Sequence, residues 1–152
     1  MLVTLQKFFQ KHNIRKDQKN SNNELMLLCG IMMEAAAIDG TVDQNEILKI
    51  KTSLITIFNE KSEEVEDSIT SCLEKINEPN SLHFFTSKLN KSFDNNKKII
   101  LFETLWEIVL SDQRIHDFES HFIYRLAGLM YISSVDCANA KRRVLKKLKI
   151  DW

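Results

Sequence analysis

The segment EAAAIDGTVDQNEILKI at residues 34–50 decides how this chain folds, because its pattern returns as EIVLSDQRIHDFESHFI at residues 107–123. Both copies read E-x4-D-x2-[VI]-x3-E at a constant offset of 73 residues, and each lies between apolar helical stretches. Such an internal repeat predicts that one helix–corner–helix unit occurs twice. Two copies favour a pseudo-twofold packing that would bring the corners together, although the repeat alone does not place them in contact.

The rest of the chain has the same helical period. No segment alternates between apolar and polar residues as a strand does, and 3 glycines and 1 proline argue against a turn-rich β fold. We therefore predict an all-α protein, a helical bundle of seven or eight helices built around the helix–corner–helix repeat. The predicted helices cover about residues 2–9, 23–38, 44–59, 63–76, 81–93, 95–110, 117–130 and 135–148.

The length of 152 residues fits a single domain. We predict an N-terminal helix and polar linker at residues 1–22, followed by the helical domain at residues 23–152. The 21 Lys and Arg balance the 21 Asp and Glu, which argues against nucleic acid as a partner.

Three cysteines, Cys29, Cys72 and Cys137, stand among apolar neighbours without a CxxC motif. This pattern is typical of reduced core residues in a cytoplasmic protein, and it predicts neither a disulfide framework nor a cysteine-based zinc site. No apolar run nears the ~18 residues that a transmembrane helix requires. The N-terminal apolar stretch is too short and interrupted for a signal peptide.

The repeated acids have two interpretations. In the first, Asp43 and Glu46 form a capping box, and Glu46 and Glu119 are favoured by the positive end of the helix dipole. Capping does not explain Asp39 and Asp112, because they stand at helix C-termini, where a negative charge is disfavoured by about 0.3–1 kcal/mol. In the second interpretation a bound cation removes this penalty, and the paired acids are its ligands.

Clustered carboxylates without His or Cys favour Ca²⁺, Mg²⁺ or Mn²⁺. The first corner also resembles the end of an EF-hand loop, but Ala35 and Ala37 stand where that loop needs its first ligands, so an independent EF-hand is excluded. An ion would be shared between the corners or held weakly with water. The candidate metal ligands are Asp39, Glu46, Asp112 and Glu119, and the candidate supporting residues are Glu34, Gly40, Asp43 and Glu107.

Residues 35–50 and 105–145 resemble the TerB-like tellurite-resistance family, whose helical domain repeats a corner of the form A-D-G-x-[IV]-D-x-x-E. The resemblance covers about residues 24–147, and the opening MLVTLQKFFQ is similar to that of an uncharacterised bacterial branch. It implies an all-helical acidic domain that binds a divalent metal, is linked to tellurite and other stress responses, and has no established catalysis.

The family pattern carries over position by position. Asp39, Gly40, Asp43 and Glu46 match the first corner, and Asp112 and Glu119 match the second. The second corner departs from the pattern, with Gln113 in place of Gly and His116 in place of Asp. These two changes weaken the second half of the implied metal site.

Rival chemistries have weaker support. His83, His116-Asp117 and Asp136 occur in the H…HD…D order of the motif residues of metal-dependent phosphohydrolases. However, His116 stands at the cap position of the repeat, which explains it without catalysis. Asp117 and His121 could share zinc or copper with Glu119, although a solvated helix face explains their spacing equally. No Glu-x-x-His, P-loop, dinucleotide turn or serine elbow occurs. We therefore expect no enzymatic activity.

The charge is polarised along the chain. Residues 34–67 hold nine acids against three bases, whereas residues 141–149 hold six bases and no acid. This favours an alternative function, a metal-free protein–protein interaction module whose acidic face binds a basic protein partner. Contact of the basic C-terminal helix with a membrane surface is a weaker alternative, because such a helix more often packs its apolar face and solvates the rest.

Overall fold

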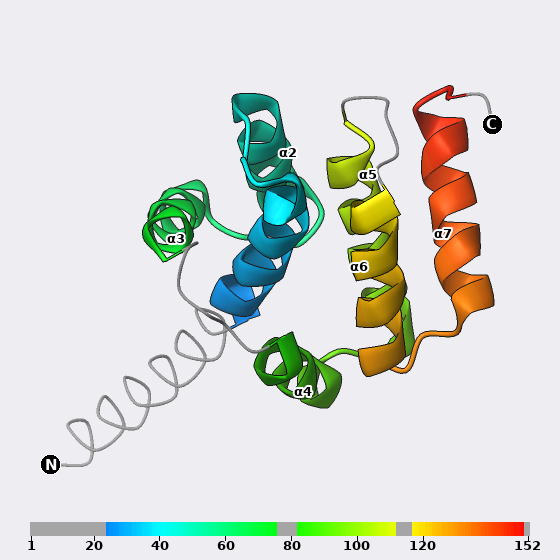
Figure 1. Ribbon diagram of the computed structural model, residues 1–152. Coiled ribbons are helices and arrows are strands. Elements are labelled where there is room, and N and C mark those ends of the chain that lie inside the picture. The colour runs from blue at the N-terminus through cyan, green and yellow to red at the C-terminus, as the bar shows by residue number, and fades with distance from the viewer. Residues whose placement is uncertain (1–23, 76–81, 112–116, 151–152) are drawn as a thin grey trace, which may run out of the picture.

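The computed structural model describes residues 24–75, 82–111 and 117–150. Within these residues lie seven α-helices, one short 3-10 helix and no strand, which confirms the all-α prediction (Figure 1). The observed helix ends differ from the predicted ends by less than one turn, because the apolar period fixes each helix. The helix and linker predicted at residues 1–22 lie outside the described residues.

The first unit consists of three helices. Its first helix covers residues 24–36 and tightens into the 3-10 helix η1 (Ala37–Asp39). Gly40 ends it with φ of 100°, a left-handed conformation that glycine adopts at no steric cost, and donates its N–H to the Ala37 carbonyl at 2.9 Å. The corner then leads into α2 (Gln44–Thr56) and α3 (Ser62–Glu74).

The second unit has the same three parts, α5 (Asn95–Val109), α6 (Asp117–Leu129) and α7 (Ser134–Lys147). Helix α4 (Leu82–Ser92) lies between the units in sequence and packs against α6. The repeat therefore covers three helices in each unit rather than the two that the acidic motif predicts. Helices α2 and α6 both contain 13 residues and keep the offset of 73.

The third helices are shifted by one residue. The non-glycine residues Asn59 and Tyr131 adopt a left-handed backbone, with φ of 56° and 57°, and each lies three residues before the start of the following helix, α3 or α7. These residues are 72 apart, because the connection before α7 is one residue shorter than the connection before α3. Residues of α3 are thus equivalent to residues of α7 at an offset of 72.

Helices of the two units pack against one another as well as within each unit. Helix α5 packs extensively on α7, α2 packs on α3, and α2 also contacts α5 across the units. Figure 1 shows α2 and α3 on one side, and α5, α6 and α7 on the other, with α4 across their lower ends. The largest fully buried side chains come from helix 24–36, α2, α4 and α5 and include Trp106, Phe102, Leu25, Leu28, Ile31 and Met32.

Candidate functional site

The first corner touches the second unit. The 3-10 helix η1, which carries Asp39, packs against α6, the helix that follows the second corner. Two predicted ligands, Asp112 and the side chain of Asp39, lie outside the described part of the structure. The fold therefore brings the first corner to the helix that carries Glu119.

At the first corner, Asp43 and Glu46 form the predicted capping box. The Asp43 Oδ1 accepts a hydrogen bond from the Glu46 backbone N–H at 2.7 Å, and the Glu46 Oε1 accepts one from the Asp43 N–H at 3.3 Å. Glu46 is buried, with 8% of its surface exposed, whereas Asp43 is exposed. The capping box thus orients a buried carboxylate at the N-terminus of α2.

Removal of the cap should be measurable. Asp43→Ala is expected to lower the free energy of unfolding by about 1 kcal/mol, because a backbone donor of α2 loses its acceptor. Glu46→Gln should be mild, since glutamine also completes a capping box. Urea denaturation followed by circular dichroism measures both, and a larger loss for Glu46→Gln than for Asp43→Ala would contradict the capping role.

At the second corner, Glu119 occupies the first turn of α6, in the place that Glu46 has in α2. It is also buried, with 4% of its surface exposed, while the neighbouring Asp117 is exposed. Backbone N–H groups at a helix N-terminus favour a carboxylate there. The two units therefore each bury one glutamate at the start of their second helix.

Glu107, the acid before the second corner, is held by two lysines. Its Oε2 lies 2.9 Å from the Lys49 Nζ and its Oε1 lies 2.5 Å from the Lys147 Nζ, and only 5% of Glu107 is exposed. Burial acts to raise the pKa of Glu107, but hydrogen bonds from Lys147 and Lys49, with their charges, outweigh it and hold the pKa below its usual range. Because both of its oxygens are engaged, Glu107 ties α5 to α2 and α7 rather than serving as a ligand.

Glu34, the equivalent acid of the first unit, has different surroundings. It lines a pocket of about 260 Å³ that also contains Lys75, the residue equivalent to Lys147. Glu34 further lines a cavity of about 420 Å³ with Phe122 and Arg125 of α6. Phe122 stands in the place that Lys49 has in the first unit, so the pseudo-twofold arrangement is kept while the chemistry of the two sites differs.

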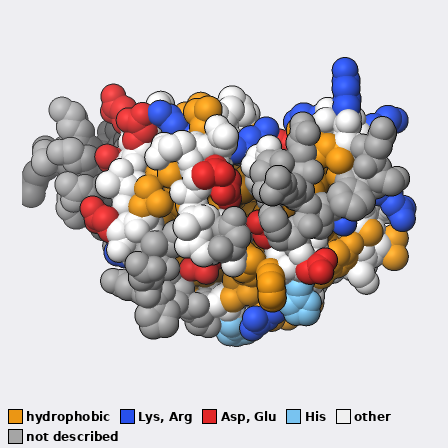
Figure 2. All heavy atoms as spheres, turned by 45° about the horizontal axis from the view of Figure 1, so that its top comes forward, with side chains coloured by type: hydrophobic (Ala, Val, Ile, Leu, Met, Phe, Trp, Pro, Cys, Tyr) orange, Lys and Arg blue, Asp and Glu red, His pale blue; other side chains and the backbone are white. Residues whose placement is uncertain are grey.

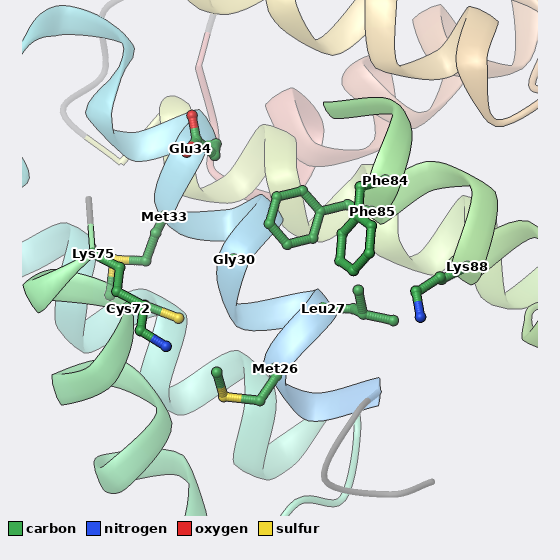
Figure 3. Close-up of a pocket in the computed structure, with 10 residues that line it drawn as sticks. All are labelled: Met26, Leu27, Gly30, Met33, Glu34, Cys72, Lys75, Phe84, Phe85 and Lys88. Atoms are coloured by element: carbon green, nitrogen blue, oxygen red, sulfur yellow. The ribbon is translucent and has the colours of Figure 1, made fainter. Parts of the chain in front are cut away.

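The sequence did not predict the pocket beside Glu34. Its walls come from helix 24–36, α3 and α4, and Figure 3 shows the α3 residues to one side of the helix and the α4 residues to the other. The one available signal was Gly30 inside an apolar helix, because a Cβ there would lie 2.9 Å from the Phe85 ring. The lining consists of Met26, Leu27, Gly30, Met33, Glu34, Cys72, Lys75, Phe84, Phe85 and Lys88.

The described residues do not assemble a rival metal site. Among the residues that the structure describes, no three His, Cys, Asp or Glu side chains gather as a metal site, and these residues include Asp117, Glu119 and His121. His83 and Asp136 lie on α4 and α7, and His116 is outside the described residues.

Comparison with known proteins identifies one family. The family model described as tellurite resistance protein TerB matches residues 25–142, which is most of the chain. No curated protein and no solved structure matches the chain. Across the described residues, no helix has both the length and the apolar character to cross a membrane.

Proposed function

The chain belongs to the TerB family of tellurite-resistance proteins, and from this premise we propose that it is a non-enzymatic helical module that binds a divalent cation weakly at its paired acidic corners. In this proposal it acts in the cytoplasm, in a response to stress that includes tellurite, together with a protein partner. The supporting observation is the packing of η1, which carries Asp39, against α6, whose first turn buries Glu119.

The donor set suits a hard cation. Asp39, Glu46, Asp112 and Glu119 supply only carboxylate oxygens, which favour Ca²⁺, Mg²⁺ or Mn²⁺ over zinc or copper. The hydrogen bond from Asp43 to Glu46 Oε1 is compatible with ligation, since a carboxylate oxygen has two lone pairs. Glu107 supports the corner through its lysines and is left out of the ligand set.

The test is thermal unfolding with and without ions. Millimolar Ca²⁺, Mg²⁺ or Mn²⁺ should raise the melting temperature over that in EDTA, and roughly 1–3 kcal/mol is the ceiling for a weak site. Asp39→Asn and Asp112→Asn should stabilise the protein in EDTA, because each removes a negative charge at a helix C-terminus. In saturating metal the same changes should be relatively destabilising, because they remove ligands.

Asp94→Asn is the matched control. Asp94 caps α5 by accepting a hydrogen bond from the Lys97 N–H at 2.8 Å, away from both corners, so its replacement should leave the ion-dependent gain intact. Melting curves that are identical in EDTA and in every ion would refute cation binding.

The segregation of charge supports a second candidate, a metal-free interaction module. Figure 2 shows acidic side chains toward the α2 and α3 end and Lys and Arg side chains toward the α7 end. The acidic end suits a basic protein, and salt should weaken such binding. With this function the ions leave the melting curve unchanged, and a basic peptide perturbs the amide resonances of α2 and α3 rather than those of α7.

A further inference from the structure

Two of the three cysteines meet between neighbouring helices. Cys29, in helix 24–36, is fully buried, and its thiol adjoins that of Cys72, a half-buried residue of α3 that packs on the same core cluster and lines a pocket with residues of helix 24–36. Both are free thiols. They are far apart in sequence and stand in no cysteine motif, so only the packing of these two helices brings them together.

The internal repeat shows what this place in the fold otherwise contains. The residues equivalent to Cys29 and Cys72 are Phe102 of α5 and Val144 of α7, both buried, on helices that pack against each other. In the second unit this position is thus filled by apolar side chains. The first unit fulfils the same packing requirement with two sulfur atoms, which adds a chemistry that packing alone does not need.

Cys72 is reachable from outside, because it lines the pocket of about 260 Å³ beside helix 24–36. Figure 3 shows its sulfur on the side of the pocket where Lys75 lies. A small neutral molecule therefore has a route to the sulfur of Cys72, while Cys29 lies behind it in the core.

The charges around the pair distinguish the two thiols. The hydrogen bond from Cys29 lowers the pKa of Cys72 against the effect of burial, and the nearby Lys75 ammonium lowers it further. The pKa of Cys29 is raised by the same hydrogen bond and by burial. Cys72 is therefore the thiol that reacts as a thiolate, and Cys29 is the neutral donor beside it.

We propose that Cys29 and Cys72 form an oxidisable dithiol that reduces a hydroperoxide entering the pocket. The Cys72 thiolate attacks the terminal peroxide oxygen, the O–O bond breaks, and the leaving alkoxide or hydroxide takes a proton to become an alcohol or water. Cys72 is then a sulfenic acid. The Cys29 sulfur attacks it, the S–O bond breaks, and water leaves with the Cys29 proton as the disulfide forms. The dithiol loses two electrons and the peroxide gains them.

The experiment treats the full chain with stoichiometric hydrogen peroxide at neutral pH. Free thiols should fall from three to one, the intact mass should fall by two hydrogens, and dithiothreitol should restore both. Peptide mapping should link Cys29 to Cys72. Cys137→Ser is the matched control, because the third cysteine is buried on α7 and burial raises its pKa to about 11, so this variant should still form the link.

Further variants separate this chemistry from packing. Cys72→Ser and Cys29→Ala should both abolish the disulfide between Cys29 and Cys72. If Cys29→Ala unfolds the protein because Cys29 lies in the core, Cys72→Ser still tests the proposal. Lys75→Met should slow the loss of thiols several-fold and shift its pH profile upward. Lys88→Met should not, because Lys88 lies over the Phe84 ring, 4.9 Å from its centroid, in the same pocket. Three surviving thiols, a stable sulfinic acid at Cys72, or a disulfide only between chains would overturn the proposal.

Discussion

Trp106→Ala is expected to lower the free energy of unfolding by about 3–5 kcal/mol, the usual cost of truncating a large buried aromatic side chain. Trp106 has no exposed surface, and its Nε1 donates a hydrogen bond to the Cys137 carbonyl at 3.2 Å. Its ring also meets Tyr124 edge-on, with centroids 5.8 Å apart. One side chain thus joins α5, α6 and α7, and urea denaturation followed by circular dichroism measures its loss.

Phe118→Ala is the control for this change. Phe118 is also a large aromatic residue of the second unit, but 79% of its surface is exposed on α6. Its replacement should stay within about 0.5 kcal/mol, as is usual for surface positions. Similar losses for the two variants would mean that α5, α6 and α7 do not share the packed core described above.

Glu107→Gln is expected to have the next largest effect, a loss of roughly 1–3 kcal/mol near pH 7, because a buried carboxylate with two charged donors is replaced by a neutral amide. The pKa of Glu107 is lower in the folded protein than in the unfolded chain. Its stabilising effect is therefore fully present above the unfolded pKa of about 4.3 and is lost as the pH falls through the lower folded pKa. Urea denaturation from pH 7 into this acidic range should show the two proteins converging.

Glu66→Gln provides the matched comparison for Glu107. Glu66 also accepts a hydrogen bond from a lysine, Lys51, at 2.5 Å, but its side chain is 59% exposed. Solvent screens such surface pairs, so we expect little change in stability at any pH. A pH-independent loss in Glu107→Gln would instead assign its cost to shape rather than to charge.

The sequence predicted the helices, caps and turns, because these features depend on residues that are close together in the chain. The helical period located every described helix, and Asp39-Gly40 and Asp43 with Glu46 marked the first corner correctly, because caps and left-handed turns are decided within a few residues. The third helix of the repeat escaped detection. The connection before α7 is one residue shorter than its counterpart, which breaks the constant offset. Equivalent core residues such as Cys29 and Phe102 are both buried but differ in identity.

The contacts that define the sites depend on packing between distant segments. Nothing near Glu107 in sequence indicates that Lys49 and Lys147 converge on it, and no motif joins Cys29 to Cys72. The pocket beside Glu34 likewise draws on three helices, with Gly30 as its single local signal. The predicted ligands Asp39 and Asp112 stay a prediction, while Glu46 and Glu119 are found buried at the starts of their helices.

Glu34 and Glu107 are equivalent residues, but Glu34 lines a pocket whereas Glu107 is paired with two lysines. In the second half, the buried Trp106 side chain and the ion pairs of Glu107 with Lys49 and Lys147 leave this part of the fold packed. In the first half the same place has Met33 instead of the tryptophan and is left as an open chamber. Because unfilled volume lacks dispersion contacts, we expect the first half to be less tightly packed at this place than the second half. The two units repeat the same three helices, but the pocket of about 260 Å³ lies beside Glu34 of the first unit.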